Sequence, residues 1–314
     1  MENLIFSLNA TLPIFLTMIL GGFFRKVGIM DSAFVAKVNK FVFTAAIPAL
    51  VFQDISSVDI RENWDGGFVL FCFLVTLISI GAVAFFSLFF AKPDERGEFV
   101  QAAYRSSAAI LGIAFIQNIY GNAGMAPLMI IGTVPLYNIF AVIVLSFLKP
   151  NREKMDRSLL WKTVKGILTN PIILGIFIGM IWSVLRIPQP EILHKTVKNI
   201  AVLATPLGLM AMGASFEGKK ALAKIKPTIA ASAFKLVILA AVFLPVAVHL
   251  GYRREQLVAI LVMLGSATTV SCFIMAKNMG HEGVLTSSTV MVTTFFSAFT
   301  LTGWLFLLKT LGLV

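Results

Sequence analysis

Long apolar runs separated by short polar stretches set the pattern of this chain. A helix needs roughly 20 apolar residues to cross the hydrocarbon core of a bilayer, whereas an open sheet would leave backbone groups unpaired in lipid. The pattern therefore predicts an all-α membrane protein with ten transmembrane helices, at about 3–24, 33–54, 67–91, 98–119, 124–148, 168–186, 192–216, 227–250, 255–277 and 284–308.

Composition supports a membrane protein and argues against several other classes. Of the 314 residues, 58% are hydrophobic and only 13% are charged. The net charge of +11 lies in short loops between the spans, which indicates membrane retention rather than nucleic-acid binding. Cys72 and Cys272 fall inside predicted spans and no metal-ligand spacing occurs, so neither a metal nor another cofactor is expected. The spans hold no HExxH motif, Ser–His pair or Asp dyad, so the chain is not expected to be an enzyme.

The distribution of Lys and Arg predicts the orientation. Eighteen of the 26 basic residues fall in or beside the loops after the first, third, fifth, seventh and ninth spans, and seven fall on the opposite side. Because basic loops stay in the cytoplasm, both termini are predicted to lie outside it. No cleavable signal pattern precedes the first span, so that span is expected to be retained.

Segments of the first half of the sequence also match segments of the second half. An offset of 158 residues aligns TLPIFLTMILGGFFRKVGI with TNPIILGIFIGMIWSVLRI, and an offset of 159 aligns RSSA at 105–108 with LGSA at 264–267. The identical pairs at the first offset include Thr11/Thr169, Pro13/Pro171, Gly21/Gly179 and Pro48/Pro206. One register serving three separate spans indicates an internal repeat.

The repeat predicts the architecture. Its two units, 1–148 and 168–314, hold five spans each and are joined by a basic cytoplasmic loop at 149–167. Because five is odd, the two units enter the membrane from opposite sides, which is the inverted-repeat plan of secondary transporters. In that plan the substrate site lies near the membrane midplane, where the corresponding helix of each half is broken.

Small and hydroxylated residues gather in the fourth span of each half, in YRSSAAILGIAFIQNIYG and LGSATTVSCFIMAKNMG. Hydroxyl groups and half-helix N-termini can bind a substrate carboxylate, although small residues also let helices pack closely. The predicted substrate-binding residues are Arg105, Ser106, Ser107, Gly112, Gly265, Ser266, Thr268, Thr269 and Ser271.

Two basic residues in the spans each have two interpretations. Arg105 either attracts an anion or anchors its helix by snorkelling to the headgroups. Lys235 lies inside the eighth span, and an ionisable group there indicates function. It is predicted to stabilise the crossing electrostatically, in place of a sodium ion or as a proton carrier, the alternative being a snorkelling lysine. Pro48 and Pro206 are predicted to kink their helices.

Three motifs resemble the auxin efflux carrier family, which includes the PIN-type auxin exporters and bacterial malate and malonate permeases. They are N-K-x-V-F-x-x-A-x-P-A-L-x-F at 39–52, P-L-x-L-x-A-x-G-A-S-F at 206–216 and A-K-x-x-G at 276–280. The resemblance covers essentially the whole chain. It implies an elevator transporter of the bile-acid-symporter-like (NhaA-like) fold, in a bacterial inner membrane, with organic anions as the usual substrates.

The resemblance also implies a division of labour among the helices. Spans one, two, six and seven would form a scaffold, dimeric through the second and seventh, and spans three to five and eight to ten a moving transport domain. The chain departs from the family at the crossing, where it has neither the proline nor the asparagine that relatives carry. The helix breaks are therefore expected at Gly112 and Gly265, with Ser and Thr side chains bonding the freed backbone groups.

Together these observations predict a secondary active transporter of small organic anions, mono- or dicarboxylates such as malate-like or auxin-like acids, that works by alternating access. A channel or membrane sensor on the same fold is the alternative. The sequence does not distinguish three transport modes: proton-coupled transport, sodium-coupled transport and uniport.

Overall fold

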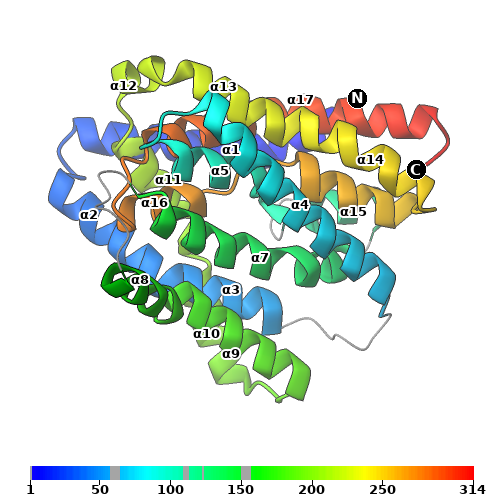
Figure 1. The fold of residues 1–314 in the computed structure, drawn as a ribbon, viewed down its shortest axis with the longest axis horizontal. Helices are drawn as coiled ribbons and strands as arrows, with labels where there is room; N and C mark the ends of the chain where they lie inside the picture. The colour runs from blue at the N-terminus through cyan, green and yellow to red at the C-terminus, as the bar shows by residue number, and fades with distance from the viewer. Residues whose placement is uncertain (1, 57–63, 109–112, 122–123, 150–156) are drawn as a thin grey trace.

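The computed structural model of the chain (Figure 1) describes residues 2–56, 64–108, 113–121, 124–149 and 157–314. Within these residues the chain is helical apart from its connections, and extended backbone pairs only at an isolated antiparallel bridge between Ser106 and Thr268. The predicted all-α class is therefore confirmed for the described part of the chain.

The helices follow the predicted spans in order. The first half contains α1 (Glu2–Lys26), α2 (Ser32–Phe41), the π-helix η1 (Val42–Ala46), α3 (Ile47–Ser56), α4 (Gly66–Phe90), α5 (Arg96–Tyr104), α6 (Ile113–Tyr120) and α7 (Ala126–Phe147). The second half contains α8 (Arg157–Leu168), α9 (Pro171–Leu185), α10 (Glu191–Ala201), α11 (Ala204–Ala214), α12 (Gly218–Ala223), α13 (Ile225–Ala233), the π-helix η3 (Phe234–Ile238), α14 (Leu239–His249), α15 (Arg254–Gly265), α16 (Ser271–Asn278) and α17 (Val284–Thr310).

Length and composition identify membrane-spanning helices in the described residues. Six helical runs are long and apolar enough to cross a bilayer, and α9, with 15 residues, is a shorter apolar helix. A multi-pass membrane protein is therefore confirmed, while the full set of ten crossings stays a prediction. The six runs are Ser32–Ser56, Gly66–Phe90, Ala126–Phe147, Glu191–Ala214, Ile225–His249 and Val284–Thr310.

Local sequence explains where several helices begin or bend. Phe34 N donates to Asp31 Oδ1 at 2.6 Å at the start of α2, and Asp65 caps α4 in the same way. Proline cannot donate the backbone bond that a continuous helix needs. The helix geometry changes just before both predicted kink residues, from η1 to α3 ahead of Pro48 and from α10 to α11 ahead of Pro206.

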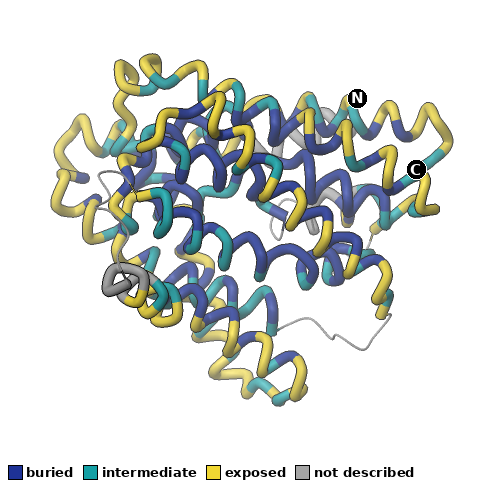
Figure 2. The backbone as a smooth tube through the Cα atoms, in the orientation of Figure 1, coloured by how far each residue is buried: buried dark blue, intermediate teal, exposed yellow. Residues whose placement is uncertain are grey.

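The helices form two groups of contacts, which also meet each other, most extensively where α1 packs on α17. In one, α1 packs on α11, and α3 packs on α9 and α10. In the other, α4, α5 and α7 contact one another, while α13 and α15 pack on α17. Figure 2 shows buried positions concentrated along α7 and exposed positions along the outer helix α9. Large apolar side chains such as Phe89 and Leu185 are exposed, as lipid-facing residues are.

Glycines bring the helices of the first group together in a repeated pattern. A Cβ added at Gly21 of α1 would lie 2.1 Å from the carbonyl oxygen of Met210 in α11. A Cβ added at Gly179 of α9 would lie 3.2 Å from the carbonyl oxygen of Phe52 in α3. Gly21 and Gly179 are partners at the 158-residue offset, and so are Phe52 and Met210. The contacts therefore follow the register of the sequence repeat.

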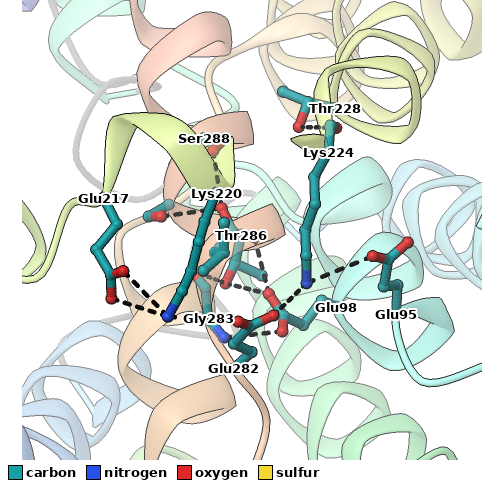
Figure 3. Close-up of polar contacts among 12 residues, drawn as sticks. Glu95, Glu98, Glu217, Lys220, Lys224, Thr228, Glu282, Gly283, Thr286 and Ser288 are labelled. Carbon is teal, nitrogen blue, oxygen red and sulfur yellow. Dashed lines mark hydrogen bonds and ion pairs between the residues drawn. The ribbon is translucent and has the colours of Figure 1, made fainter. Parts of the chain in front are cut away.

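A polar cluster joins three connections at one end of the molecule (Figure 3). Lys224 Nζ lies 3.4 Å from Glu95 Oε1 and forms a second ion pair with Glu282. Burial alone would lower the pKa of Lys224, but the hydrogen bond with Glu282 and the neighbouring carboxylates raise it above its usual value. The same hydrogen bond lowers the pKa of Glu282. Both side chains are therefore charged at neutral pH.

Glu98 lies beside this cluster and is 1% exposed. Its carboxylate accepts hydrogen bonds from Gly283 N at 2.8 Å, from Thr286 N at 3.0 Å and from Thr286 Oγ1 at 3.0 Å. These donors belong to the N-terminus of α17, whose partial positive charge favours a carboxylate. Glu98 of α5 thereby fixes the start of α17.

We predict that Gly21→Ala destabilises the contact between α1 and α11, because a Cβ 2.1 Å from a backbone oxygen forces the two helices apart. Overpacking of this kind costs about 1–3 kcal/mol. Gly22→Ala is the matched control, since its Cβ would approach nothing closer than Gly213 O at 3.6 Å. Thermal unfolding of the purified protein in detergent measures both variants. Equal melting temperatures for the two would contradict this packing.

Candidate functional site

Two helices break and their extended ends cross. Helix α5 ends at Tyr104 and is followed by Arg105 in extended conformation, while α15 ends at Gly265 and is followed by extended Ser266. The bridge between Ser106 and Thr268 joins the two extended segments, and Ser107 N donates to Ala267 O at 2.9 Å. We call residues 105–108 and 266–270 the crossing. The antiparallel arrangement is the one that an inverted repeat predicts.

Two carbonyl groups freed at the end of α15, those of Met263 and Leu264, accept hydrogen bonds from side chains. Met263 O accepts from Ser106 Oγ, from Tyr137 Oη at 3.1 Å and from Lys235 Nζ at 3.4 Å. Leu264 O accepts from Lys235 Nζ at 2.6 Å. A buried carbonyl without a partner would cost about 1–3 kcal/mol. These donors offset that cost and so stabilise the end of α15 in an apolar interior.

Hydroxyl groups also hold the other strand of the crossing. Thr268 Oγ1 donates to Ala102 O near the end of α5 at 2.7 Å, and Thr268 N donates to Thr293 Oγ1 of α17 at 3.0 Å. Gln101 Nε2 of α5 donates to Cys272 O of α16 at 2.9 Å. Both broken helices are thus tied to each other and to α17.

Glycine does not force the break in α15. A Cβ added at Gly265 would meet Leu261 Cδ1 at 3.5 Å, an ordinary van der Waals contact, and Gly265 has no positive φ. The position of the break matches the prediction, but the donors to Met263 O and Leu264 O stabilise it rather than glycine geometry. The second predicted break residue, Gly112, lies outside the described residues.

Lys235 is fully buried, within the π-helical turn η3. Its ammonium group faces the C-terminal end of α15, where helix carbonyls carry partial negative charge. A side chain with 0% exposure does not reach the headgroups, so the snorkelling interpretation is wrong for this conformation.

Arg105 is also buried, with 2% of its surface exposed. Its Nη2 donates to Asn138 Oδ1 and its Nη1 to Met275 Sδ, each at 2.9 Å. Its Nε has no hydrogen-bond partner, and no carboxylate in the described part of the chain forms an ion pair with it. This guanidinium is therefore too buried to be a headgroup anchor and retains donor capacity.

Two cavities adjoin the crossing. The larger, of about 150 Å³, lies between α1, α3, α11, α17 and the second strand of the crossing. The smaller, of about 50 Å³, lies between α3, α7 and the first strand. Four residues line both: Leu50, Ser107, Thr269 and Ser271.

The structure gathers most of the predicted site residues around these cavities. Thr268 lines the larger cavity, and Arg105 and Ser106 line the smaller one. Ser266 and Gly265 line neither. Ser266 is fully buried and its Oγ has no hydrogen-bond partner. The predicted direct contact between a substrate and Gly265 or Ser266 is therefore not favoured by the geometry.

Three polar residues that line the smaller cavity fell outside the predicted set: Asp54, Tyr137 and Asn138. Asn138 holds Arg105 and is itself oriented by its Nδ2 donating to Val134 O at 2.9 Å. Asp54 comes from α3 and shares the smaller cavity with Arg105. An acidic residue at the end of a predicted span was the signal for Asp54, whereas nothing in the sequence places Tyr137 at the crossing.

Comparison with known proteins identifies the family. The model of the family described as membrane transport protein matches residues 6–305. The chain belongs to this family. It is the auxin efflux carrier family that the motifs resemble. A protein of Rhizobium meliloti (strain 1021) named "Putative malonate transporter" is 27% identical over 293 residues, which cover 86% of each chain.

We predict that Ser106→Ala lowers the melting temperature of this family member, because it removes one donor from Met263 O. The loss should amount to about 0.5–1.5 kcal/mol. Ser107→Ala is the matched control, since the Ser107 hydroxyl makes no hydrogen bond within the described residues and faces the cavities. Thermal unfolding without added ligand compares them. A Ser107→Ala variant as unstable as Ser106→Ala would contradict these separate roles.

Proposed function

We propose that the chain is a secondary transporter of small organic anions, mono- or dicarboxylates, which bind at the crossing. The observation that carries the proposal is the buried Arg105 guanidinium, which borders a cavity and whose printed hydrogen-bond partners, Asn138 and Met275, are uncharged. A buried charge is costly without a partner. A substrate carboxylate would supply the missing charge through charge-assisted hydrogen bonds.

Hydroxyl groups around the cavities suit the same ligand. Thr269 Oγ1 and Ser271 Oγ lie 3.3 Å apart beside the N-terminus of α16, and Ser107 faces them across both cavities. A helix N-terminus adds N–H groups and partial positive charge. The larger cavity of about 150 Å³ is well below the about 300–1,000 Å³ of drug-sized pockets, which favours a small acid.

Alternating access would move one group of helices against the other. Helices α4–α7 and α13–α17 would carry the crossing as a transport domain, and α1–α3 with α9–α11 would form the scaffold. In support, the larger cavity is lined by α1, α3 and α11 on one side and by the crossing and α17 on the other. A site at that boundary can be exposed to either side of the membrane by relative motion of the two groups.

Lys235 would set the electrostatics of the transport domain. Its ammonium bonds Leu264 O at 2.6 Å, and backbone carbonyls of unwound helices coordinate sodium in other transporters. The Lys235 amino group occupies the position at Leu264 O that a coordinated cation would take. We therefore expect Lys235 to replace a coupling ion at this position, and substrate to bind without sodium.

A panel of carboxylates tests the proposal. We expect malonate, the acid in the relative's printed name, or another small carboxylate to raise the melting temperature, with or without sodium. Arg105→Gln should weaken binding about 10- to 100-fold, the value of a charged hydrogen bond. Lys37→Gln, on exposed α2, is the charge control.

Two further variants keep this test decisive if Arg105→Gln fails to fold. Ser107→Ala and Thr269→Ala should lower carboxylate affinity without disturbing the bonds that hold the broken helix, and each can be titrated by the same thermal shift. A flat response of the wild-type protein to every carboxylate would overturn the assignment.

A further inference from the structure

A recess of about 430 Å³ lies apart from the two crossing cavities and is larger than either. Its polar lining residues are Arg25, Ser32, Asn39, Ser215, Glu217 and Lys277. They come from the end of α1, from α2, from the segment after α11 and from the end of α16. Charge counting places the loops at these helix ends in the cytoplasm, so the recess faces the cytoplasm in the predicted orientation.

The recess carries net positive charge. Arg25 donates to Ser32 Oγ at 2.7 Å and to Met30 O at 3.3 Å, and Lys277 Nζ to Glu282 O at 3.2 Å. These acceptors are uncharged, and neither cation forms an ion pair in the described part of the chain. The one acidic group of the lining, Glu217, is paired with Lys220 at 3.0 Å.

Helix dipoles do not cancel this charge. Arg25 and Lys277 lie in the last turns of α1 and α16, where helix C-termini carry partial negative charge. That charge is about half a unit at each terminus, which leaves an excess on both cations. An anion in the recess would therefore meet a net positive charge.

Asn39 adds an unused polar group to the same space. The residue is 5% exposed, it lines the recess, and its Oδ1 has no hydrogen-bond partner. The oxygen and nitrogen of an amide can exchange places, so the Asn39 side chain can turn its NH₂ group toward an anion. A buried amide without a partner in a basic recess points to a ligand with acceptor oxygens.

The recess and the larger crossing cavity share one helix. Ser271 and Ile274 of α16 line the cavity, and Lys277 lines the recess, about 9 Å further along the helix axis from Ser271 at 1.5 Å per residue. Gly208 of α11 fits against Val270, whose Cγ1 would be 3.0 Å from an added Cβ. Asn278 Nδ2 also donates to Asn39 O at 3.1 Å. These contacts pack the α16 region on α11 and α2.

We propose that the recess is a second carboxylate site, where the substrate anion is held at the cytoplasmic face before it moves between the recess and the crossing. The proposal rests on the proposed function and deepens it. Arg25 and Lys277 supply the charge, Asn39 an orienting donor, and separation of α16 from α2 and α11 would connect the recess to the cavity.

Cysteine chemistry tests the recess directly. Both native cysteines are buried with 0% exposure, so Ser215→Cys introduces the accessible thiol. We expect the anionic sulfonatoethyl methanethiosulfonate to react faster than the cationic trimethylammonioethyl reagent. Replacing Arg25 and Lys277 by Gln should slow the anionic reagent about tenfold, as two charges at roughly 5–6 Å in water imply, and should lower the rate ratio further because the cationic reagent reacts faster. Lys26→Gln, beside Arg25 but outside the recess lining, should leave the ratio unchanged.

Occupancy is measured by protection. Malonate, at constant ionic strength, should slow modification of Ser215→Cys but not of Ala223→Cys, an exposed position on α12. The Arg25→Gln, Lys277→Gln double variant should lose the protection. Equal reaction of both reagents, or no protection by malonate, would overturn the recess site.

Two further arms separate this inference from the proposed function and from a lipid site. Protection of Ser107→Cys without protection of Ser215→Cys rejects the recess alone, and the reverse pattern rejects the site at the crossing alone. The measurements are repeated in vesicles of phosphatidylcholine with and without phosphatidylglycerol. Protection by phosphatidylglycerol in the absence of malonate, and none by malonate, would assign the recess to an anionic headgroup instead.

Discussion

The whole site depends on one constraint: a helix that stops inside an apolar protein leaves carbonyl groups that must find donors. At the end of α15 the donors are an ammonium and two hydroxyls, from Lys235, Ser106 and Tyr137. They come from η3, from the extended strand after α5 and from α7, so the break cannot form until those segments are assembled. The hydrogen bonds that satisfy the end of α15 therefore also fix the geometry of the crossing.

That geometry leaves a second group in need of a partner. Arg105 is carried into the interior by the strand that follows α5, and its neighbours Asn138 and Met275 are uncharged. In the proposed function, Lys235 is bonded by the protein's own backbone, whereas the charge of Arg105 would be balanced by a ligand. This division of roles is the physical basis for proposing anion transport by this member of the membrane transport protein family.

Much of this arrangement was predictable because it depends on local sequence. Apolar run length gave the helix positions, and the 159-residue match of RSSA with LGSA located the crossing. Long-range contacts were not predictable. Only the fold brings Tyr137 to Met263, and only the fold shows that Ser266 lines neither crossing cavity while Asp54 lines one. Glycine was overvalued as the cause of the break, since the donors that stabilise it are distant in sequence.

The central claim is that a carboxylate binds Arg105 and is carried across the membrane, and counterflow tests it most directly. Proteoliposomes loaded with unlabelled malonate are diluted into labelled malonate. The account predicts transient accumulation of label by the wild-type protein, saturable in malonate and lost in Arg105→Gln, with Lys37→Gln as the control. Label that equilibrates without an overshoot, as through a pore, or an overshoot unchanged by Arg105→Gln, would contradict it.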